Sequence, residues 1–584
     1  MKLRIRYAIA TVAAMAAAVW AAVWAAEAPQ GPKYEPTWES LKQYRVPSWF
    51  EDDKFGIFIH WGVYAVPAFG NEWYPRNMYL KGEAAYEHHR KTYGDQKTFG
   101  YKDFIPKFTA EKWDPQAWAE LFAQAGARFV VPVAEHHDGF AMYDSSHTEF
   151  SAAKMGPKRD IAGELAKAVR AKGMRFGLSS HYAFNYYYYT HSDEFDTIDP
   201  KFVGLYNKPH DEKAPASEEF MNLWLARTTE IIDKYQPDIL WFDFCFERPE
   251  FEPYRQKIGA YYYNKGVEWN KGVVLQHKHE AFPEGTAVLD VERGKLDAIR
   301  PMIWQTDTSI SRKSWGYIDN DEFKSADSLV DDLVDIVSKN GALLLNIGPR
   351  ADGTIPDEAR DRLLAIGKWL KANGEAIYGT RPWRVYGEGP TKFKAGPMAE
   401  GEAKPFTAAD IRFTRKGNLL YAICLDKPAE AVRIEALGKA SAAGIEIVAI
   451  KRLGAAEPLV WSCDDNALTI RMPAALEGEY AFVFSIGLKG CLLGKPRLSV
   501  GADGKTLAAE LDVENFEGQN YSATLSCFVN GKAIATRKVV VAPQARQSLQ
   551  FTGELPAEGL VEVVVGTDEV KSPAAKLERA AAKP

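Results

Sequence analysis

The chain has 584 residues, of which 46% are hydrophobic and 26% are charged, a composition that indicates a globular protein and excludes a disordered or fibrous one. Because a domain usually has roughly 100 to 200 residues and an α/β barrel about 250, the length predicts three domains. The 72 basic and 78 acidic residues give a net charge of -6, which offers no basic surface for nucleic acid, so no nucleic-acid partner is expected.

Residues 1–28 have the sequence pattern of a signal peptide. Lys2, Arg4 and Arg6 precede an apolar, alanine-rich run that ends in small residues. A membrane anchor is the alternative interpretation, because the run approaches the roughly 20 residues that span a bilayer. No later apolar run reaches that length. We therefore expect signal cleavage, export to the periplasm or the cell exterior, and no stable membrane insertion afterwards.

Residues 30–383 alternate short apolar runs with stretches of helical period, which predicts βα units around a parallel sheet. The carboxyl ends of all strands in such a barrel open on one face. Seven of the apolar runs end in polar residues. For any single run, the polar residue could simply mark the place where a buried strand meets solvent. That explanation does not account for the repeated occurrence of His and Asp at these ends. The pattern predicts a TIM-like (β/α)8 barrel with one polar pocket. The runs are residues 55–59, 129–134, 176–178, 239–242, 273–275, 303–304 and 343–345.

Three helices are expected between these strands, at residues 160–172, 217–235 and 358–378. In the first, Ile161, Leu165 and Val169 recur every four residues, and Gly173 supplies a stop signal. Helices of this kind would form the outer layer of the barrel.

Two all-β sandwich domains are predicted after the barrel, at residues 384–489 and 490–574. Short strand-like runs separated by turn signals fill this part of the chain. Asn530-Gly531 is typical of a hairpin turn in the second, immunoglobulin-like domain. Neither domain shows a cluster of ligand-binding residues, so we expect both to be structural, and residues 575–584 to be a frayed tail.

Asp243 is the first candidate for a catalytic carboxylate. It ends the apolar run of residues 239–242, between the rings of Phe242 and Phe244. A buried carboxylate costs free energy unless it is paired or used in chemistry. An aspartate at a strand end is often only a turn former, but the surrounding rings favour a functional role here.

Glu292 is the second candidate acid. Glycoside hydrolysis needs two carboxyl groups, one that attacks or activates water and one that protonates the departing oxygen. A solvated surface glutamate is the alternative interpretation, and Asp290, Glu247 and Glu250 are competing acids.

Four of the 11 histidines, His60, His136, His137 and His181, stand at the ends of predicted strands. Imidazoles in these positions suggest hydrogen bonds to sugar hydroxyls or a metal site. Adjacent residues of a strand point to opposite faces, so only one of His136 and His137 can easily enter a shared coordination shell. The five cysteines lack metal-binding or disulfide spacing. We therefore expect no metal and no other cofactor.

A loop after the first strand, residues 71–76, combines Glu72 and Trp73 with a further ring and a cation. A carboxylate that accepts hydroxyl hydrogens beside rings that stack on C–H faces makes a sugar subsite, although packing of the loop on the barrel is an alternative. Trp61, Trp241 and Trp315 are expected to wall the same pocket.

Several motifs follow one another in order along residues 40–385. They are FGIFIHWG at 55–62, EWY at 72–74, HHDGF at 136–140, WFD at 241–243, SWGY at 314–317, LLNIGP at 344–349 and NGEAIY at 373–378. This series resembles the α-L-fucosidases of glycoside hydrolase family 29, and so many ordered motifs make a chance match very improbable.

The resemblance implies a metal-free, retaining exo-hydrolase that removes terminal α-L-fucosyl residues from a fucosylated oligosaccharide or polysaccharide by double displacement. By motif, Asp243 is the expected nucleophile, and Glu292 is the expected acid/base from its place between Asp243 and residues 314–317. The other positions expected to bind fucose are His60, Glu72, Trp73, His136, His137, Trp241 and Trp315, with His181 and Lys278 as weaker matches.

Two features depart from the family pattern. Gln305 and Asp307 stand where many relatives show Glu and Cys, and the last β domain lies outside the common family core. A different specificity, such as one for galactosides, is therefore an open alternative. A carbohydrate-binding barrel without catalysis is the other, although both acids and all four histidines are present. The sequence leaves the association of chains open.

Overall fold

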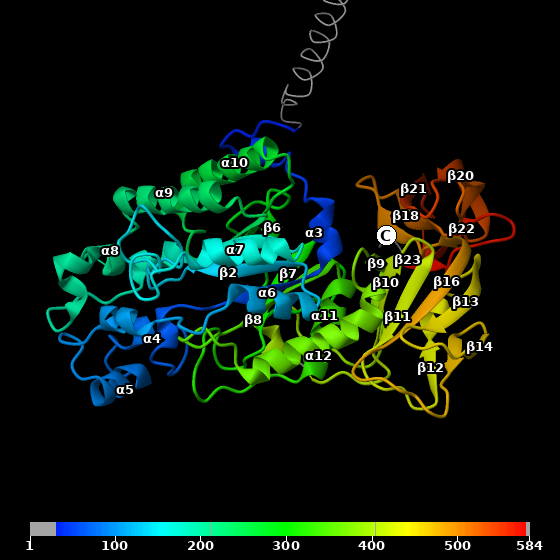
Figure 1. Ribbon diagram of the computed structural model, residues 1–584. Coiled ribbons are helices and arrows are strands. Elements are labelled where there is room, and N and C mark those ends of the chain that lie inside the picture. The colour runs from blue at the N-terminus through cyan, green and yellow to red at the C-terminus, as the bar shows by residue number, and fades with distance from the viewer. Residues whose placement is uncertain (1–30, 212, 403, 557, 580–584) are drawn as a thin grey trace, which may run out of the picture.

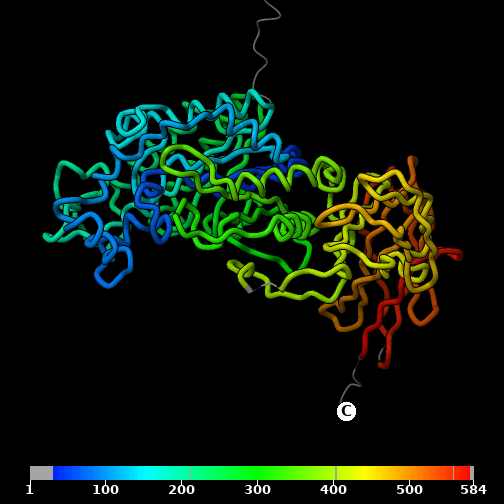
Figure 2. The backbone as a smooth tube through the Cα atoms, turned by 60° about the horizontal axis from the view of Figure 1, so that its bottom comes forward, coloured from blue at the N-terminus to red at the C-terminus, as the bar shows by residue number. Residues whose placement is uncertain are grey.

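The computed structural model describes residues 31–211, 213–402, 404–556 and 558–579. The predicted signal peptide at residues 1–28 lies outside them. A helix-covered barrel makes up one end of the molecule and β-sheets make up the other (Figure 1). A second view shows the same two parts next to each other, with a light-green segment near residue 400 running from the β-sheets back along the barrel (Figure 2).

Eight parallel strands form the barrel, in the order β6-β5-β4-β3-β2-β1-β8-β7. A parallel bridge between Asp290 and Gln305 joins the two ends of this series. The predicted TIM-like barrel is therefore confirmed. Its strands are β1 (Phe55–Ile59), β2 (Phe129–Glu135), β3 (Arg175–Ser180), β4 (Ile239–Phe242), β5 (Val274–His277), β6 (Val288–Leu289), β7 (Trp304–Ser309) and β8 (Gly341–Ile347).

The barrel strands are apolar on both faces because each face packs against a different core. In β2, Phe129 and Val131 belong to the cluster inside the barrel, whereas Val130 and Ala134 belong to the cluster beneath the helices. This alternation follows from the two-residue period of a strand. It explains why the sequence shows continuous apolar runs that stop only where the strands reach the barrel mouth.

Long helices cover the outside of the barrel, and side-chain caps begin two of those that the sequence predicts. Asp160 accepts from the N–H of Gly163, and Ser217 accepts from that of Phe220. The third predicted helix ends at Asn373 rather than 378, because Gly374 begins a 3-10 turn. The helices are α2 (Trp38–Leu41), α3 (Ser48–Asp53), α4 (Tyr74–Asn77), α5 (Ala84–Thr92), α6 (Pro115–Gln124), α7 (Ile161–Ala171), α8 (Val203–Tyr206), α9 (Glu218–Tyr235), α10 (Glu252–Glu268), α11 (Ala326–Ser338) and α12 (Asp357–Asn373).

One arc of the barrel departs from the regular alternation of strand and helix. Residues 278–303, all of which are described, contain only the two-residue strand β6 and turns. No helix therefore follows β5 or β6 within these residues. The part of this arc before β6 contacts two helices, since Tyr263 of α10 donates to the carbonyl of Thr286 and Trp38 of α2 packs on Phe282 at 5.4 Å. The part after β6 has no helix of its own to cover it.

Two antiparallel β-sandwiches follow the barrel, each with its own apolar core. The first contains the sheet of β9 (Arg381–Glu388), β10 (Ile411–Lys416), β11 (Leu419–Cys424), β16 (Phe482–Leu493) and β13 (Ile445–Arg452), and the sheet of β12 (Ala431–Ile434), β15 (Leu468–Arg471) and β14 (Val460–Cys463). The second contains β17 (Arg497–Val500), β18 (Thr506–Asn515) and β21 (Arg546–Glu554), and the sheet of β20 (Lys532–Val541), β19 (Tyr521–Val529), β22 (Gly559–Gly566) and β23 (Ala575–Arg579).

The predicted domain limits fall inside strands rather than in linkers. The limit at 383/384 lies within β9, and the limit at 489/490 lies within β16, which pairs with β11 through its first half and with β18 through Cys491 to Leu493. The prediction of a frayed tail is wrong for residues 575–579, which form β23. There Ala575 and Leu577 pair with Val563 and Val561, Ala575 is buried and Leu577 packs on the second core, so burial holds this segment in the sheet.

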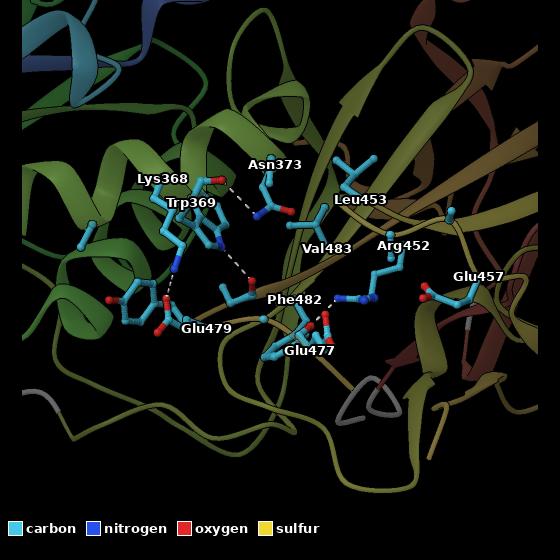
Figure 3. Close-up of a pocket in the computed structure, with 18 residues that line it drawn as sticks. Lys368, Trp369, Asn373, Arg452, Leu453, Glu457, Glu477, Glu479, Phe482 and Val483 are labelled. Atoms are coloured by element: carbon cyan, nitrogen blue, oxygen red, sulfur yellow. Dashed lines mark hydrogen bonds and ion pairs between the residues drawn. The ribbon is translucent and has the colours of Figure 1, made fainter. Parts of the chain in front are cut away.

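The first sandwich is fixed to the barrel through α11 and α12. Asp335 of α11 binds Arg412 of β10 at 2.7 Å and Lys339 at 2.7 Å, and all three side chains are buried. On α12, Trp369 Nε1 donates to the carbonyl of Ala481 at 2.8 Å, beside a hollow of about 480 Å³ between the helix and the sandwich (Figure 3). The two domains therefore share polar contacts as well as apolar ones.

All five cysteines lie in the described part of the chain and are free thiols, and four of them are buried. This agrees with the absence of disulfide spacing in the sequence. Among the described residues, every helix is too short or too polar to cross a membrane.

Candidate active site

The predicted site residues gather at the mouth of the barrel because each follows the carboxyl end of a strand. His60 follows β1, His136 and His137 follow β2, and His181 follows β3. The next three strands in the ring supply the charged groups. Asp243 directly follows β4, Lys278 directly follows β5, and Glu292 stands three residues after β6.

Asp243 is 7% exposed and lies between two imidazoles and an ammonium. Its Oδ2 atom is 3.0 Å from Nδ1 of His181 and 3.2 Å from Nε2 of His137. Its Oδ1 atom is 3.1 Å from Nζ of Lys278, but it accepts no well-aligned hydrogen bond from the described residues. One carboxylate oxygen is thus anchored, and the other is open to a ligand.

Lys278 joins Asp243 to the second candidate acid. Its ammonium lies 2.7 Å from Oε2 of Glu292 and 3.4 Å from Oδ2 of Asp307. The Lys278 side chain is 5% exposed, whereas that of Glu292 is 23% exposed. Three carboxyl groups therefore surround one buried cation, and Glu292 is the one nearest to solvent.

The charged form of Asp243 is favoured by its neighbours. Burial alone would raise the pKa of Asp243, but the ammonium of Lys278 and then His181 hold that pKa well below its usual value. Burial lowers the pKa of His181 to about 4. Asp243 is therefore a carboxylate near neutral pH, and His181 is neutral and donates its Nδ1 hydrogen to it.

A neutral imidazole with a free acceptor stands at the end of β1. The Asn346 amide is oriented by Nδ2, which donates to Ser309 Oγ at 3.0 Å and to the carbonyl of Trp315 at 2.8 Å. Its oxygen lies 2.8 Å from Nδ1 of His60, so this nitrogen donates. Burial lowers the pKa of His60 well below its usual value, which leaves Nε2 as an acceptor for a ligand hydroxyl.

His136 contributes an unused polar atom to the same place. Its Nδ1 atom is buried and has no hydrogen-bond partner among the described residues. Its ring centroid lies 5.0 Å from that of His181 and 5.8 Å from that of His60. A buried polar atom without a partner costs free energy, so this nitrogen marks a position where a ligand can bind.

Glu72 belongs to the same site although its loop is separate in sequence. Its Oε2 atom accepts from the N–H of Trp315 at 2.9 Å and from Ser314 Oγ at 3.1 Å. Burial raises the pKa of this carboxyl above its usual value. The loop of residues 71–76 is thereby tied to the segment after β7.

Aromatic rings surround these polar groups. Trp241 packs inside the barrel, 5.1 Å from the ring of His181 and with the Lys278 ammonium 5.0 Å above its face. Trp315 lies 5.1 Å from His60, and Trp73 lies 5.3 Å from His137.

Trp61 was expected beside the other rings, and that expectation is wrong. Its ring packs on Trp118 of α6 at 5.0 Å, and its Nε1 atom donates to the carbonyl of Arg350. Trp61 follows His60 directly, so its side chain points to the opposite side, toward the helices.

Comparisons with known proteins show which chains are similar to this one. A sequence profile described as alpha-L-fucosidase matches residues 21–375. The α-L-fucosidase of Branchiostoma floridae is 31% identical over 486 residues, which are 79% of this chain and 97% of that protein. The tissue α-L-fucosidase of Homo sapiens is 32% identical over 467 residues, 78% of this chain and 92% of that protein.

This chain belongs to the α-L-fucosidase family. A solved structure of the same kind, the α-fucosidase of Thermotoga maritima in complex with fucose, is similar with a TM-score of 0.63 and 35% identity. The match covers 78% of this chain and 100% of the Thermotoga maritima chain. The fucosidase fold is therefore complete here, and this chain carries additional residues.

The competing acids of this fucosidase-family site have other contacts. Asp290 Oδ2 accepts from Trp241 Nε1 at 3.0 Å and from the amide of Gln305. Glu250 accepts from Tyr187 and Arg248, at 2.9 and 3.0 Å. Glu247 has a buried oxygen without a hydrogen-bond partner among the described residues. Of the four candidates, only Glu292 forms an ion pair with Lys278 in the part of the chain that is described.

Within the described residues, two groups of side chains could each hold a metal ion. One is His60, His136 and His181, and the other is His137, His181 and Asp243, with ligand atoms within 4.8 Å of one another in each group. The expectation that only one of His136 and His137 can enter the site is wrong, because both rings follow the end of β2, lie 4.5 Å apart and stand 5.0 and 5.5 Å from the ring of His181. The same atoms can instead bind the hydroxyls of a sugar.

Asn346 and Asp307 are site residues whose roles sequence reasoning did not assign. Asn346 was visible only as the polar end of a strand, and its contact with His60 depends on the pairing of β1 with β8. Burial and the nearby Asp290 raise the pKa of Asp307 well above its usual value. Asp307 was noted only as a departure from the family, and its place beside Lys278 depends on the closure of the barrel.

Proposed function

We propose that this protein is a retaining exo-α-L-fucosidase in which Asp243 is the nucleophile and Glu292 is the acid/base. The observation that carries the proposal is the ammonium of Lys278 between the two carboxylates. Oxygens that lie 3.1 and 2.7 Å from one nitrogen are at most about 5.8 Å apart, near the roughly 5 to 5.5 Å of retaining enzymes and short of the roughly 6.5 to 9.5 Å of inverting ones.

In the first step, Oδ1 of Asp243 attacks the anomeric carbon while Glu292 gives a proton to the departing aglycone oxygen. The C–O bond to the aglycone breaks, and a fucosyl ester of Asp243 forms. Oδ2 stays anchored by His181 and His137, which hold the carboxylate in one orientation. The neutral state of His181 keeps its Nδ1 hydrogen available for this role.

In the second step, Glu292 removes a proton from water, and the water attacks the anomeric carbon to release fucose. Esterification removes the negative charge of Asp243. Lys278 is then left with the carboxylate of Glu292, which is the form that a general base requires. The same ammonium therefore assists both carboxyl groups in turn.

The sugar hydroxyls are assigned to groups that lack protein partners. His60 offers Nε2 as an acceptor, and His136 offers its unpartnered Nδ1 atom. Glu72 is held in place by two donors and stands beside Trp315. The rings of Trp73, Trp241 and Trp315 supply apolar surface for the C–H faces of the sugar.

Proton NMR during hydrolysis of an aryl α-L-fucoside tests the reaction. A retaining enzyme releases α-L-fucose first, before mutarotation, whereas first release of the β-anomer would reject double displacement. An aryl β-D-galactoside in the same assay tests the alternative specificity. Glycan binding without hydrolysis of any aryl glycoside would instead support a binding protein.

We also infer that the chain is exported, from the order of cations, apolar residues and small residues in positions 1–28. N-terminal sequencing of the mature protein from its native host tests this. A start near residue 29 is expected. An intact Met1 in a membrane-bound chain would favour an anchor.

A further inference from the structure

The acid/base candidate stands in the arc of the barrel that has no helix. A long segment of the first β domain between β9 and β10, of which residues 389–402 and 404–410 are described, lies against this arc, and we refer to these residues as the connector. In Figure 2 it is the light-green trace that runs from the β-sheets back along the barrel. The connector is about one hundred residues away in sequence from Glu292, so only the tertiary fold brings them together.

Backbone hydrogen bonds pair the connector with residues 292–295. The N–H of Met398 donates to the carbonyl of Glu292 at 2.8 Å, and the N–H of Glu400 donates to that of Arg293 at 3.1 Å. Lys295 and Gly396 exchange both of their hydrogen bonds, at 2.8 and 3.3 Å. Four bonds thus hold the segment that begins with Glu292 as one side of a short antiparallel ribbon.

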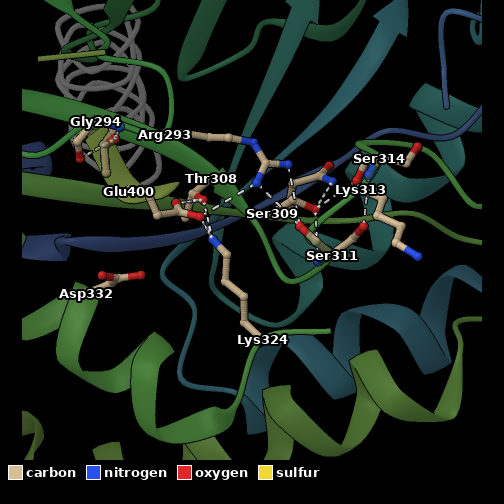
Figure 4. A network of polar contacts seen from close by, with 12 residues as sticks. Arg293, Gly294, Thr308, Ser309, Ser311, Lys313, Ser314, Lys324, Asp332 and Glu400 are labelled. Atoms are coloured by element: carbon tan, nitrogen blue, oxygen red, sulfur yellow. Dashed lines mark hydrogen bonds and ion pairs between the residues drawn. The ribbon is translucent and has the colours of Figure 1, made fainter. Parts of the chain in front are cut away.

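Charged side chains hold the connector in place on the barrel. Glu400 is bound by Lys324 and by the hydroxyl of Thr308, and it lies 3.6 Å from Arg293 (Figure 4). The side chain of Glu400 is 16% exposed, and that of Lys324 is 4% exposed. Because both charges are largely buried, their pairing is sensitive to the loss of either partner.

Lys295 gives the ribbon a second point of attachment. Its ammonium lies 2.6 Å from Asp332 of α11 and within 5.3 and 5.5 Å of the rings of Phe393 and Phe406, which both belong to the connector. The Glu292 side chain itself has Lys278 as its hydrogen-bond partner. The backbone on either side of Glu292 is also held by β7, because the N–H groups of Val291 and Arg293 donate to the carbonyls of Gln305 and Asp307 at 2.9 and 2.8 Å. The orientation of the Glu292 backbone therefore depends on the connector on one side and on β7 on the other.

We propose that the connector takes the place of the absent barrel helix and positions the acid/base, with Glu400 as the positioning residue. The inference rests on the proposed function. It makes the first β domain a part of the active site rather than an appended module. Arg293 extends the same support to the sugar site, because its guanidinium lies 4.8 Å over the ring of Trp315.

The test compares two aryl fucosides in Glu400→Gln. General-acid catalysis matters most when the leaving group is poor, so kcat/KM for phenyl α-L-fucoside is expected to fall about 10-fold, and that for 2-chloro-4-nitrophenyl α-L-fucoside less than about 2-fold. Lys394→Gln is the matched control, since it removes a charge from an exposed side chain of the same connector. The control should leave both values unchanged.

Thr308→Val is the second variant, because it removes the hydroxyl that donates to Glu400 without changing a charge or the shape of the side chain. We again expect kcat/KM to fall more with the phenyl fucoside than with the activated substrate. Thermal unfolding shows whether either variant has lost its fold. Equal losses on both substrates, or no loss in either variant, would overturn the inference. An inactive wild-type enzyme would instead contradict the proposed function.

Discussion

The two carboxylates of the site lie in parts of the barrel that are built differently. Asp243 follows a regular strand, β4, which lies between the long helices α9 and α10 in the chain. It is 7% exposed, and two imidazoles fix one of its oxygens. Glu292 follows a strand of two residues, β6, in an arc without helices. Its surroundings include Lys278 and β7 of the barrel and also a connector that belongs to another domain.

The nucleophile and the acid/base are therefore positioned by different parts of the fold. The nucleophile is placed by a strand, its neighbours in the sheet and the histidines of β2 and β3, all of which are standard parts of a parallel barrel. The acid/base is placed by contacts between distant segments. The position of the acid/base can therefore change when the β domain changes, even if the barrel stays the same. We expect substitutions to displace Glu292 more easily than Asp243.

The largest effect is expected from Asp243→Ala. Without a nucleophile no fucosyl ester can form, and turnover of an aryl fucoside should fall about 10⁴-fold or more. Thermal unfolding should show an intact fold, because Lys278 keeps its ion pair with Glu292. Undiminished activity would reject Asp243 as the nucleophile.

Glu292→Ala should have the next largest effect, and one that depends on the substrate. We expect a loss of about 10² to 10³-fold with phenyl α-L-fucoside and a much smaller one with an activated aryl fucoside. Azide should restore activity with the activated substrate, since a small anion needs no general base, and should yield fucosyl azide. Asp290→Asn is the comparison variant. Equal losses on both substrates in Glu292→Ala would move the role to Asp290 or Glu247.

The nucleophile side of the site was predictable from sequence because its signals are local. Each apolar run ended at a polar residue, and the period of two residues together with the parallel arrangement brought His60, His181 and Asp243 to one face. The contact of His60 with Asn346 was not predictable to the same degree. It depends on which strands are neighbours, and this is a property of barrel closure rather than of either segment.

The acid side was less predictable because its parts are individually unremarkable in sequence. Residues 278–303 show no helical period, but nothing in them indicates which segment covers the arc. The connector, rich in Gly, Pro and Lys, resembles an ordinary linker. Similarly, β23 was taken for a tail because five residues at a chain end carry a weak pattern, and only pairing with β22 reveals the strand.

The attachment of the connector's domain to the barrel can be tested through Asp335→Asn. Asp335 binds Arg412 and Lys339 at 2.7 Å, and its loss would leave two buried cations without a partner. Breaking such a pair costs about 3 to 5 kcal/mol of unfolding free energy. The matched control is Glu479→Gln, which removes an exposed ion pair with Lys368 on α12 and should cost far less, because water screens the two charges.

Thermal and chemical denaturation of both variants measure this difference. Equal effects would show that the buried contact between α11 and β10 contributes no more than the exposed one. In that case the connector would be held by its own contacts with residues 292–295 and with Thr308 and Lys324.

The smallest expected effect concerns the stability of the two regions in acid. Burial lowers the pKa of His277, at the end of β5, to about 4, as it does for His181 on the nucleophile side. An unfolded histidine has a pKa of about 6.5, so the unfolded chain binds these protons first. The contribution of each neutral histidine to the free energy of unfolding is therefore complete above about pH 6.5. It is lost as the pH falls toward about 4, by up to about 1.4 kcal/mol per pH unit for each group.

His277→Gln should reduce the slope of the unfolding free energy against pH by the contribution of one histidine, and it alters no group that contacts Asp243. Denaturant unfolding at several pH values between 4 and 7 measures the slope, and exposed His147→Gln is the matched control. A slope that is unchanged in His277→Gln would mean that this histidine already binds a proton in the folded arc. Such a result would indicate that water reaches the end of β5.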